Sequence, residues 1–258
     1  METTVNRRSC VLRVFSDPSS MNHAAADLVA AACREAVASQ GRFAIALSGG
    51  NTPRDLYRLL TEAPYRDQID WAISHVFWVD ERSVPPAHPD SNYGVVHDLL
   101  LSRVPLPPAN IHRIHGEDRP ETAALAYEVD LRKFFGTAMP AFDLVLLGMG
   151  EDGHTASLFP SHPAVEESAR LVIPVVNIAG GHQRVTMTLP VLAHASVLLF
   201  FVTGFAKAEA VSKVLEQGNP ERYPAGMVNA RSSKVQWFMD RAAASLLNNK
   251  KRSCREVV

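Results

Sequence analysis

This chain of 258 residues has few cysteines, no excess of either charge and no long apolar run. Each of these absences argues against a class of protein. The three cysteines, Cys10, Cys33 and Cys254, form no CxxC motif and no paired framework, so we expect a reducing compartment rather than secretion. The 26 basic and 27 acidic residues leave a net charge of −1, which removes the electrostatic footprint of a dedicated nucleic-acid binder. The longest apolar stretch, residues 193–202, falls far short of the roughly 18–20 residues that span a bilayer, so we expect a cytoplasmic protein without a membrane partner.

Apolar residues make up 47% of the chain and charged residues 21%, which is the balance of an ordinary globular protein. A chain of this length can bury one large core without a metal ion or a disulfide. No repeat of fixed period and no low-complexity segment divides it, so we interpret residues 1–258 as a single domain. The basic end, residues 249–258, is predicted to be a frayed tail.

Short apolar runs alternate with stretches of helical periodicity along the chain. The runs lack polar alternation, which is typical of strands buried on both faces of a sheet; they cover residues 11–15, 43–47, 75–79, 142–147, 197–202 and 235–239. Apolar residues at spacings of three and four predict helices over 21–40, 55–60, 93–101, 122–135, 206–215 and 240–247. This alternation predicts an α/β fold with a mostly parallel sheet and helices on both faces. Ligands bind at the carboxyl ends of the strands in such sheets.

The first strand end with a polar cluster is Ser48-Gly49-Gly50-Asn51-Thr52-Pro53. Pro53 fits the first position of a helix, and Thr52 or Asn51 fits its cap. Two adjacent glycines let a ligand approach the backbone, and free N–H groups at a helix start attract anions, phosphate above all. A plain capped helix start would leave the glycine pair unexplained, so we interpret this loop as phosphate-binding.

The second cluster is Asp80-Glu81-Arg82. Because side chains alternate along a strand, Asp80 and Arg82 are expected on one side and Glu81 on the other. The first pair could be a structural ion pair, or a general base and a phosphate clamp in a cleft, and the spacing leaves both interpretations open. Asp90 and Ser91 are expected to cap the following helix.

The third cluster is the richest, because an apolar strand runs into GMGEDGHTASLFP at residues 148–160. Histidine is the side chain best placed to exchange protons near neutral pH, which makes His154 the candidate general base. Asp152 could orient the imidazole or hold a water, and Gly153 permits a tight turn. A histidine alone is usually a packing residue, but three glycines at a strand end favour a functional interpretation.

The same segment also contains the dinucleotide fingerprint GxGxxG at residues 148–153, with glutamates at 166–167 near the ribose-binding spacing. Pro160 and Pro163 interrupt the long helix that this fingerprint needs. A nucleotide-dependent oxidoreductase is therefore the weaker alternative.

Further basic side chains could neutralise a phosphate dianion. Arg184 opens an apolar segment, and Lys207 follows a glycine turn at another strand end, although either could be a solvated surface charge. His112 and His115 stand three residues apart, but neither they nor His162 and His182 show a convincing metal spacing. We therefore predict no metal site.

Four blocks of sequence together resemble the 6-phosphogluconolactonase family, part of the wider glucosamine-6-phosphate isomerase/deaminase superfamily. They are SGGNTP at 48–53, DER at 80–82 with SNY at 91–93, the segment 148–160 with its specific HTASLFP part, and RVTMT at 184–188. The resemblance runs over nearly the whole chain. It implies a Rossmann-like fold without a nucleotide, and hydrolysis of 6-phospho-D-glucono-1,5-lactone to 6-phospho-D-gluconate, the second step of the oxidative pentose phosphate pathway.

The resemblance also leads to a division of roles. His154 would activate water as a general base, Asp152 would hold its tautomer, and backbone N–H groups near Gly150–Gly153 would face the oxyanion. The phosphate would be held by Ser48, Gly49, Gly50, Asn51 and Thr52, with Arg82, Arg184 and Lys207 as counter-charges. This chemistry requires no metal or redox cofactor, and a monomer or weak homodimer is expected.

Two other functions would use part of the same set of residues. The alternative within the superfamily is an amino-sugar-phosphate isomerase or deaminase, in which Asp80 would be the base. Such enzymes carry a glutamate where Phe159 stands, and a phenyl ring cannot move a proton. A non-catalytic sugar-phosphate sensor would need the glycine loop but not His154.

Overall fold

The computed structural model describes residues 9–176, 181–216, 222–248 and 254–256. Its centre is an eight-stranded sheet in the order β11-β1-β10-β9-β6-β2-β3-β5, and every neighbouring pair in it is parallel. These strands are β1 (Ser9–Phe15), β2 (Phe43–Leu47), β3 (Ser74–Trp78), β5 (Ile111–His112), β6 (Leu144–Leu147), β9 (Val197–Val202), β10 (Lys234–Asp240) and β11 (Arg255–Glu256). The predicted α/β class with a mostly parallel sheet is confirmed.

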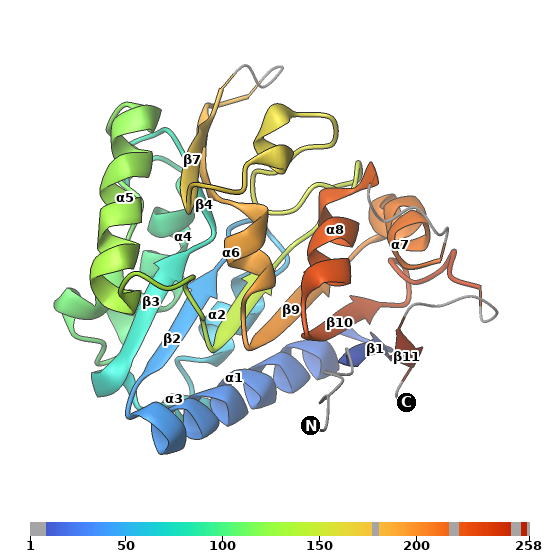
Figure 1. The fold of residues 1–258 in the computed structure, drawn as a ribbon. Coiled ribbons are helices and arrows are strands. Elements are labelled where there is room, and N and C mark those ends of the chain that lie inside the picture. Colours follow the sequence, from blue (N-terminus) through green and yellow to red (C-terminus); the bar gives the residue numbers. More distant parts are fainter. Residues whose placement is uncertain (1–8, 177–180, 217–221, 249–253, 257–258) are drawn as a thin grey trace, which may run out of the picture.

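Helices cover both faces of this sheet, as predicted, with α6 and α8 in front of it and α2 and α4 behind it in Figure 1. In one layer α1 packs on α2 and α3, and α2 packs on α4; elsewhere α8 packs on α6 and α7. The helices are α1 (Pro18–Gln40), α2 (Arg54–Leu59), α3 (Tyr65–Gln68), α4 (Asn92–Leu99), α5 (Pro120–Phe135), α6 (Leu189–Ala193), α7 (Ala208–Leu215) and α8 (Pro224–Arg231). Short 3-10 turns are η1 (Trp71–Ile73), η2 (Leu101–Arg103), η3 (Pro108–Asn110), η4 (Pro163–Glu166) and η5 (Phe205–Lys207). None of the described helices combines the length and the apolar character that crossing a bilayer requires.

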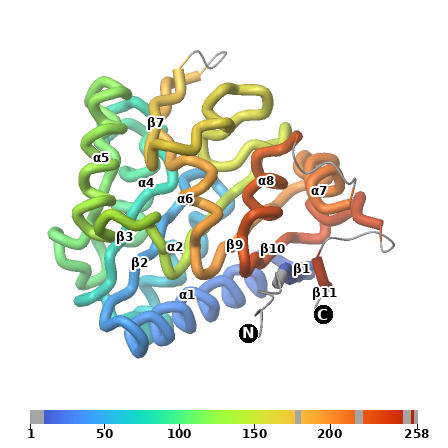
Figure 2. Tube along the Cα trace, viewed as in Figure 1, coloured from blue at the N-terminus to red at the C-terminus, as the bar shows by residue number. Residues whose placement is uncertain are grey.

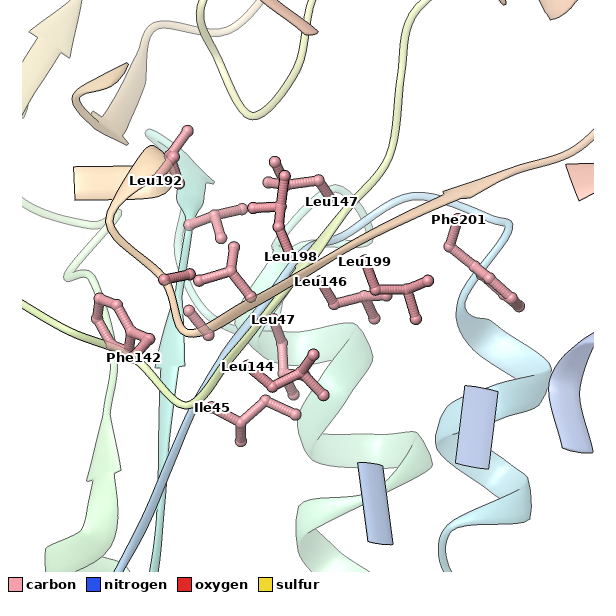
Figure 3. Close-up of a cluster of buried hydrophobic side chains, with 14 of the residues drawn as sticks. Ile45, Leu47, Phe142, Leu144, Leu146, Leu147, Leu192, Leu198, Leu199 and Phe201 are labelled. Atoms are coloured by element: carbon pink, nitrogen blue, oxygen red, sulfur yellow. The ribbon is translucent and has the colours of Figure 1, made fainter. Parts of the chain in front are cut away.

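The core is built on the central strands, since every residue of β2, β6 and β9 is buried. Figure 3 shows side chains of these strands, including Leu47, Leu146 and Leu199, together with Phe142, in one apolar cluster. Burying each such side chain contributes about 1.5–3 kcal/mol relative to leaving it in water. Burial on both faces also explains why β2 and β9 begin and end where the apolar runs predict.

A second, smaller sheet lies beyond the carboxyl ends of the central strands (Figure 1). It is antiparallel, in the order β4-β8-β7, and contains β4 (Asp80–Arg82), β7 (Val172–Val175) and β8 (Arg184–Met187). Val79 joins the two sheets, because its N–H donates to Leu47 O and its carbonyl accepts from Met187 N. The sequence did not predict this sheet, since strands of three or four residues are too short to show a clear period.

The predicted helix over residues 240–247 is wrong. Strand β10 continues to Asp240, and the chain then forms turns rather than a helix. The reason lies in the Asp240 carboxylate, which accepts the N–H of Ala243 and also that of Gly204, so that it caps the turn and holds a distant loop.

The two ends of the described chain lie side by side, as Figure 2 also shows at the lower right. Cys10 and Cys254 form a disulfide with Cα atoms 4.6 Å apart, so the prediction that the cysteines do not pair was wrong. Of the predicted tail, residues 249–253 and 257–258 lie outside the described residues, whereas Cys254 is buried and β11 pairs with β1. A contact between residues 244 apart in sequence leaves no local signal.

His75 on β3 is expected to make the stability of this fold depend on pH. Its Nδ1 lies 3.1 Å from His112 Nε2, and His112 Nδ1 lies 2.8 Å from Asp130 Oδ2. Burial, helped by the neighbouring charges of His112 and Arg42, lowers the pKa of His75 from 6.5 to about 4. Between these two values the unfolded chain binds a proton that the folded chain does not. The free energy of unfolding is therefore expected to fall as the pH drops from 6.5 towards 4, by about 1 kcal/mol after allowing for solvent screening.

Urea unfolding between pH 7 and pH 4.5 measures this effect, with His75→Phe as the matched variant because the imidazole already packs on the Phe134 ring, 4.6 Å away. The variant is expected to show a shallower loss of stability with falling pH. Equal slopes in the two proteins would show that His75 is not the titrating group.

Candidate active site

A cavity of about 400 Å³ lies at the carboxyl ends of β2, β3, β6 and β9 and brings the three predicted polar clusters together. Ten of the eleven predicted site residues line it: Ser48, Gly49, Gly50, Asn51, Thr52, Asp80, Arg82, His154, Arg184 and Lys207. The eleventh, Asp152, lies behind His154 and touches it. The imidazole and the glycine pair thus line the same cavity.

The glycine loop after β2 forms one wall of the cavity. Gly50 has a φ of +88°, a left-handed conformation that favours glycine. The N–H groups of Gly49, Gly50, Asn51 and Thr52 donate to no group within the described residues. Unpaired donors that line a cavity are suited to an anionic ligand.

The helix start after this loop differs from the prediction. Helix α2 begins at Arg54, and Pro53 occupies the cap position without a side-chain hydrogen bond. Instead of capping the helix, the Thr52 hydroxyl lies 3.0 Å from the Thr203 hydroxyl, which also lines the cavity. This contact ties the glycine loop to the end of β9.

Position 49 requires a glycine because helix α4 approaches the loop closely there. A Cβ atom at position 49 would lie 1.8 Å from Asn92 Oδ1. The Asn92 amide in turn donates to the backbone carbonyl of Asp80, at 2.8 Å, and to its Oδ1, at 3.1 Å. Asn92 lines the cavity but was not assigned a role from the sequence, although it belongs to the SNY segment that carries the resemblance.

Asp80 is a structural centre of the cavity. Its side chain is buried, and both carboxylate oxygens are engaged: Oδ1 by Asn92, and Oδ2 by the Ser157 hydroxyl at 2.6 Å. Arg82 lines the cavity as well and Glu81 does not, so the predicted alternation along this strand is confirmed. With both oxygens occupied, Asp80 holds three segments of the chain together.

Glu81 fixes the start of α4 from the other side of β4. Its carboxylate accepts the N–H groups of Arg82, Asn92 and Tyr93 and the Ser91 hydroxyl. Burial raises the pKa of Glu81, although these N–H groups act in the opposite direction. Glu81 therefore positions Asn92 against the glycine loop.

Of the two residues predicted to cap α4, one does so and the other does not. Ser91 does cap the helix, since its hydroxyl accepts the N–H of Gly94 at 3.0 Å. Asp90 does not cap it. Its carboxylate instead meets the imidazole of His182, which comes from the segment before β8, with Nε2 at 3.0 Å from Oδ2.

His154 enters the cavity from the turn after β6. Its Nδ1 lies 2.6 Å from Asp152 Oδ1, and its backbone N–H donates to the same oxygen. Burial acts to raise the pKa of Asp152, but the hydrogen bond from the His154 backbone and the nearby imidazole outweigh it and lower that pKa. The Nε2 atom of His154 has no protein partner within the described residues. The pair is thus arranged with Nδ1 held by a carboxylate and Nε2 unengaged.

The turn around this pair requires a glycine at position 150. A Cβ atom there would lie 2.1 Å from His154 Nδ1 and 2.6 Å from Asp152 Oδ1. The prediction that N–H groups of Gly150–Gly153 face an oxyanion needs correction, because Gly150 N donates to His154 O and Gly153 N to Gly150 O. Two of the expected donors are therefore used to close the turn.

The chain that follows Gly153 is also relevant to the dinucleotide alternative. It continues in turns, and the next helical element is the 3-10 turn η4, residues Pro163–Glu166. The long helix that the fingerprint requires therefore does not follow its third glycine.

Three cationic side chains surround the cavity. Arg82 and Arg184 sit opposite each other in the β4–β8 pairing, and Lys207 approaches from the loop after β9. Burial lowers the pKa of the Arg184 guanidinium, while Asp80 acts to raise it. Among the described lining residues Asp80 is the sole acid, and its oxygens are already engaged. Lys207 also pairs with Glu151 at 3.8 Å. Three cations against one acid leave the lining with a net positive charge, which selects for an anion.

Fold and cavity together define an α/β protein that can hold a small anion beside a histidine–aspartate pair. The chain belongs to the family of glucosamine-6-phosphate isomerases and 6-phosphogluconolactonases, whose family model matches residues 16–237. It is 40% identical over 245 residues to human 6-phosphogluconolactonase, covering 92% of this chain and 93% of the relative. It is 39% identical over 250 residues to a probable chloroplastic 6-phosphogluconolactonase 3 of rice, covering 92% and 76%. The structure of 6-phosphogluconolactonase from Trypanosoma cruzi matches with a TM-score of 0.81 at 25% identity, covering 94% of this chain and 98% of that one. The family resemblance inferred from the sequence is confirmed.

Proposed function

We propose that this protein hydrolyses 6-phospho-D-glucono-1,5-lactone to 6-phospho-D-gluconate, the second step of the oxidative pentose phosphate pathway. The observation that carries the proposal is the single cavity in which unpaired N–H groups and three cations face the His154–Asp152 pair. Relatives named 6-phosphogluconolactonase, about 40% identical over most of both chains, support lactone hydrolysis. The proposal includes a cytoplasmic protein that is a monomer or a weak homodimer.

In this proposal the phosphate group is the handle of the substrate. The N–H groups of the glycine loop would donate to its oxygens, and Arg82, Arg184 and Lys207 would balance its charge. Binding energy from this remote dianion would then place the lactone carbonyl against His154.

The chemical step assigns the proton transfers to one imidazole. His154 Nε2 would take a proton from a water molecule as the water oxygen bonds to the lactone carbonyl carbon. When the tetrahedral intermediate collapses, the bond to the ring oxygen breaks and the imidazolium returns the proton to that oxygen. Asp152, 2.6 Å from Nδ1, would hold the productive tautomer and stabilise the imidazolium.

Asp80 has a positioning role in this mechanism. A general base needs a free oxygen facing the substrate, and both oxygens of Asp80 are bonded to Asn92 and Ser157. The Phe159 ring packs on the His154 ring with centroids 4.7 Å apart, where the deaminases are expected to carry a glutamate. Both features favour lactone hydrolysis over isomerisation or deamination of an amino sugar.

The test of the proposal is an assay on freshly prepared lactone, corrected for spontaneous hydrolysis. We expect enzyme-dependent release of 6-phosphogluconate. The fluorescence of NADH or NADPH should not change when the protein is added. Lactone that disappears only at the spontaneous rate would reject the proposal, and lactone binding without turnover would identify a sugar-phosphate sensor instead.

Removing one cationic side chain should weaken substrate binding more than turnover. Arg184→Met or Lys207→Met is expected to raise KM for the lactone by about 10- to 100-fold, because each charge-assisted hydrogen bond contributes about 1.5–3 kcal/mol. Initial rates over a range of lactone concentrations measure the effect. Arg231→Met, at an exposed position on α8, is the control and should leave KM unchanged. An unchanged KM in both cavity variants would contradict their assignment to the phosphate.

A further inference from the structure

Three metal-ligating side chains meet on the surface beside the cavity, and the proposed reaction uses none of them. His88 and Asp90 lie in the loop between β4 and α4, and His182 lies just before β8. One ligating atom of each lies within 4.8 Å of those of the other two. The sequence suggested no such cluster, because His182 is far from the other two along the chain and no spacing rule joins them.

The backbone holds these two segments in register. Ser83 N donates to Gln183 O at 2.8 Å, in line with the antiparallel pairing of Arg82 with Arg184. This hydrogen bond extends the β4–β8 pairing into the two loops that carry the cluster. The residues of the cluster are placed before any ligand arrives, which lowers the entropic cost of binding.

The distances match a small transition-metal ion. His182 Nε2 lies 3.0 Å and His88 Nδ1 lies 3.9 Å from the same oxygen of Asp90, Oδ2. Tetrahedral zinc, with bonds of about 2.0–2.1 Å, places its ligand atoms about 3.3 Å apart. The Asp90–His182 separation is about 0.3 Å below that spacing and the Asp90–His88 separation about 0.6 Å above it, while the ligand atoms of all three residues lie within 4.8 Å of one another. Two imidazoles and one carboxylate form a donor set that zinc commonly uses.

The protonation states of the cluster also suit a cation. Asp90 N donates to His88 Nδ1 at 3.1 Å, so this nitrogen carries a lone pair rather than a proton, and a metal ion bound there would displace that N–H. A metal ion would replace the proton that His182 now shares with Asp90.

Two guanidinium groups also contact the cluster and connect it with the cavity. Arg82 Nη1 donates to Asp90 O at 2.7 Å, and Arg184 Nε donates to His182 O at 3.2 Å. Both arginines line the active-site cavity on one side and a second hollow with Asp90, Gly181 and His182 on the other. Their charges oppose a cation, so we expect an exchangeable ion rather than a tightly held structural one.

We propose that His88, Asp90 and His182 form a binding site for one divalent zinc-like transition-metal ion. The site is exposed on one side, which leaves at least one coordination position for water or for an anion. It does not depend on the proposed hydrolysis, since its evidence is the donor set and its spacing.

The test is calorimetric titration of the full chain, stripped with EDTA and dialysed, with Zn²⁺. We expect one ion per chain, with the affinity reduced at least about tenfold in His182→Ala and in Asp90→Asn. Titration with Co²⁺, followed by its visible absorption, should give a tetrahedral spectrum that His182→Ala abolishes. His97→Ala is the matched control, because His97 pairs with the carboxylate of Asp98 alone on the exposed side of α4 and should bind no ion by itself.

A second control separates this site from the active-site histidine. His154→Ala should leave Zn²⁺ binding unchanged while it reduces lactone turnover, so the zinc site and the proposed function can fail independently. Absence of stoichiometric binding, binding that survives both His182→Ala and Asp90→Asn, or binding lost in His154→Ala would each overturn the proposal. Circular dichroism and urea unfolding of each variant establish that the comparison is between folded proteins.

Discussion

Replacing His154 by alanine is expected to lower kcat for lactone hydrolysis by about 10²- to 10⁴-fold, equivalent to about 3–5 kcal/mol of transition-state stabilisation. The imidazole of His154 lines the cavity, and its Nε2 is unengaged by the described residues and suited to proton transfer. Its Nδ1 is bonded to Asp152. The KM for the lactone should change little, because the phosphate would be held by the opposite wall.

Initial-rate kinetics on fresh lactone, with the spontaneous rate subtracted, provide the measurement. His194→Ala, at an exposed position after α6, serves as the control and should behave as wild type. The kcat of Asp152→Asn should lie between those of wild type and His154→Ala. The amide can still accept a hydrogen bond from the imidazole but no longer balances an imidazolium charge. Wild-type turnover in His154→Ala would eliminate the general-base assignment.

Replacing Gly150 by alanine is expected to reduce kcat by about 10²-fold although it removes no side chain that takes part in the reaction. The added Cβ would lie 2.1 Å from His154 Nδ1, so the imidazole and Asp152 must move apart or tilt. Displacing a catalytic group by about 1 Å typically has an effect of this size. The cost in stability should be modest, about 1–3 kcal/mol, because the clash is with movable side chains.

Gly148→Ala is the matched control for this prediction, because a Cβ atom at position 148 meets no atom within 4 Å. It lies in the same turn, two residues earlier, and lines the cavity, so the added methyl group is expected to raise KM while kcat at saturating lactone stays at the wild-type value. If both alanine variants lose activity equally, the loss reflects the turn in general and not the space that His154 needs.

The sheet was predictable where a strand is buried on both faces. Strands β2 and β9 match their apolar runs because a strand buried in that way carries its signal in consecutive residues. The small sheet gave no such signal, since β4 reads Asp-Glu-Arg and derives its structure from pairing with β8, about a hundred residues away. The same applies to the helix wrongly expected after Asp240, where one carboxylate redirects the chain.

The candidate site was predictable because its loops share one edge of the sheet. Glycine turns at the ends of β2 and β6 mark places where a backbone approaches a ligand, and a parallel sheet brings such ends together. What the sequence does not reveal are polar partners that act through distant contacts. Ser157 and Asn92, both bonded to Asp80, are of this kind: Ser157 is 77 residues from Asp80 along the chain.

The bond between Cys10 and Cys254 turns the oxidised polypeptide into a covalent ring that encloses almost its full length. Closing so large a ring removes conformational freedom from the denatured chain, and the chain-entropy estimate for this length is about 5 kcal/mol. That contribution vanishes when a thiol reductant opens the ring, whereas every residue assigned to the cavity lies elsewhere in the fold. The Tm should therefore be lower under reducing than under oxidising conditions, while kcat of the folded protein should be the same in both.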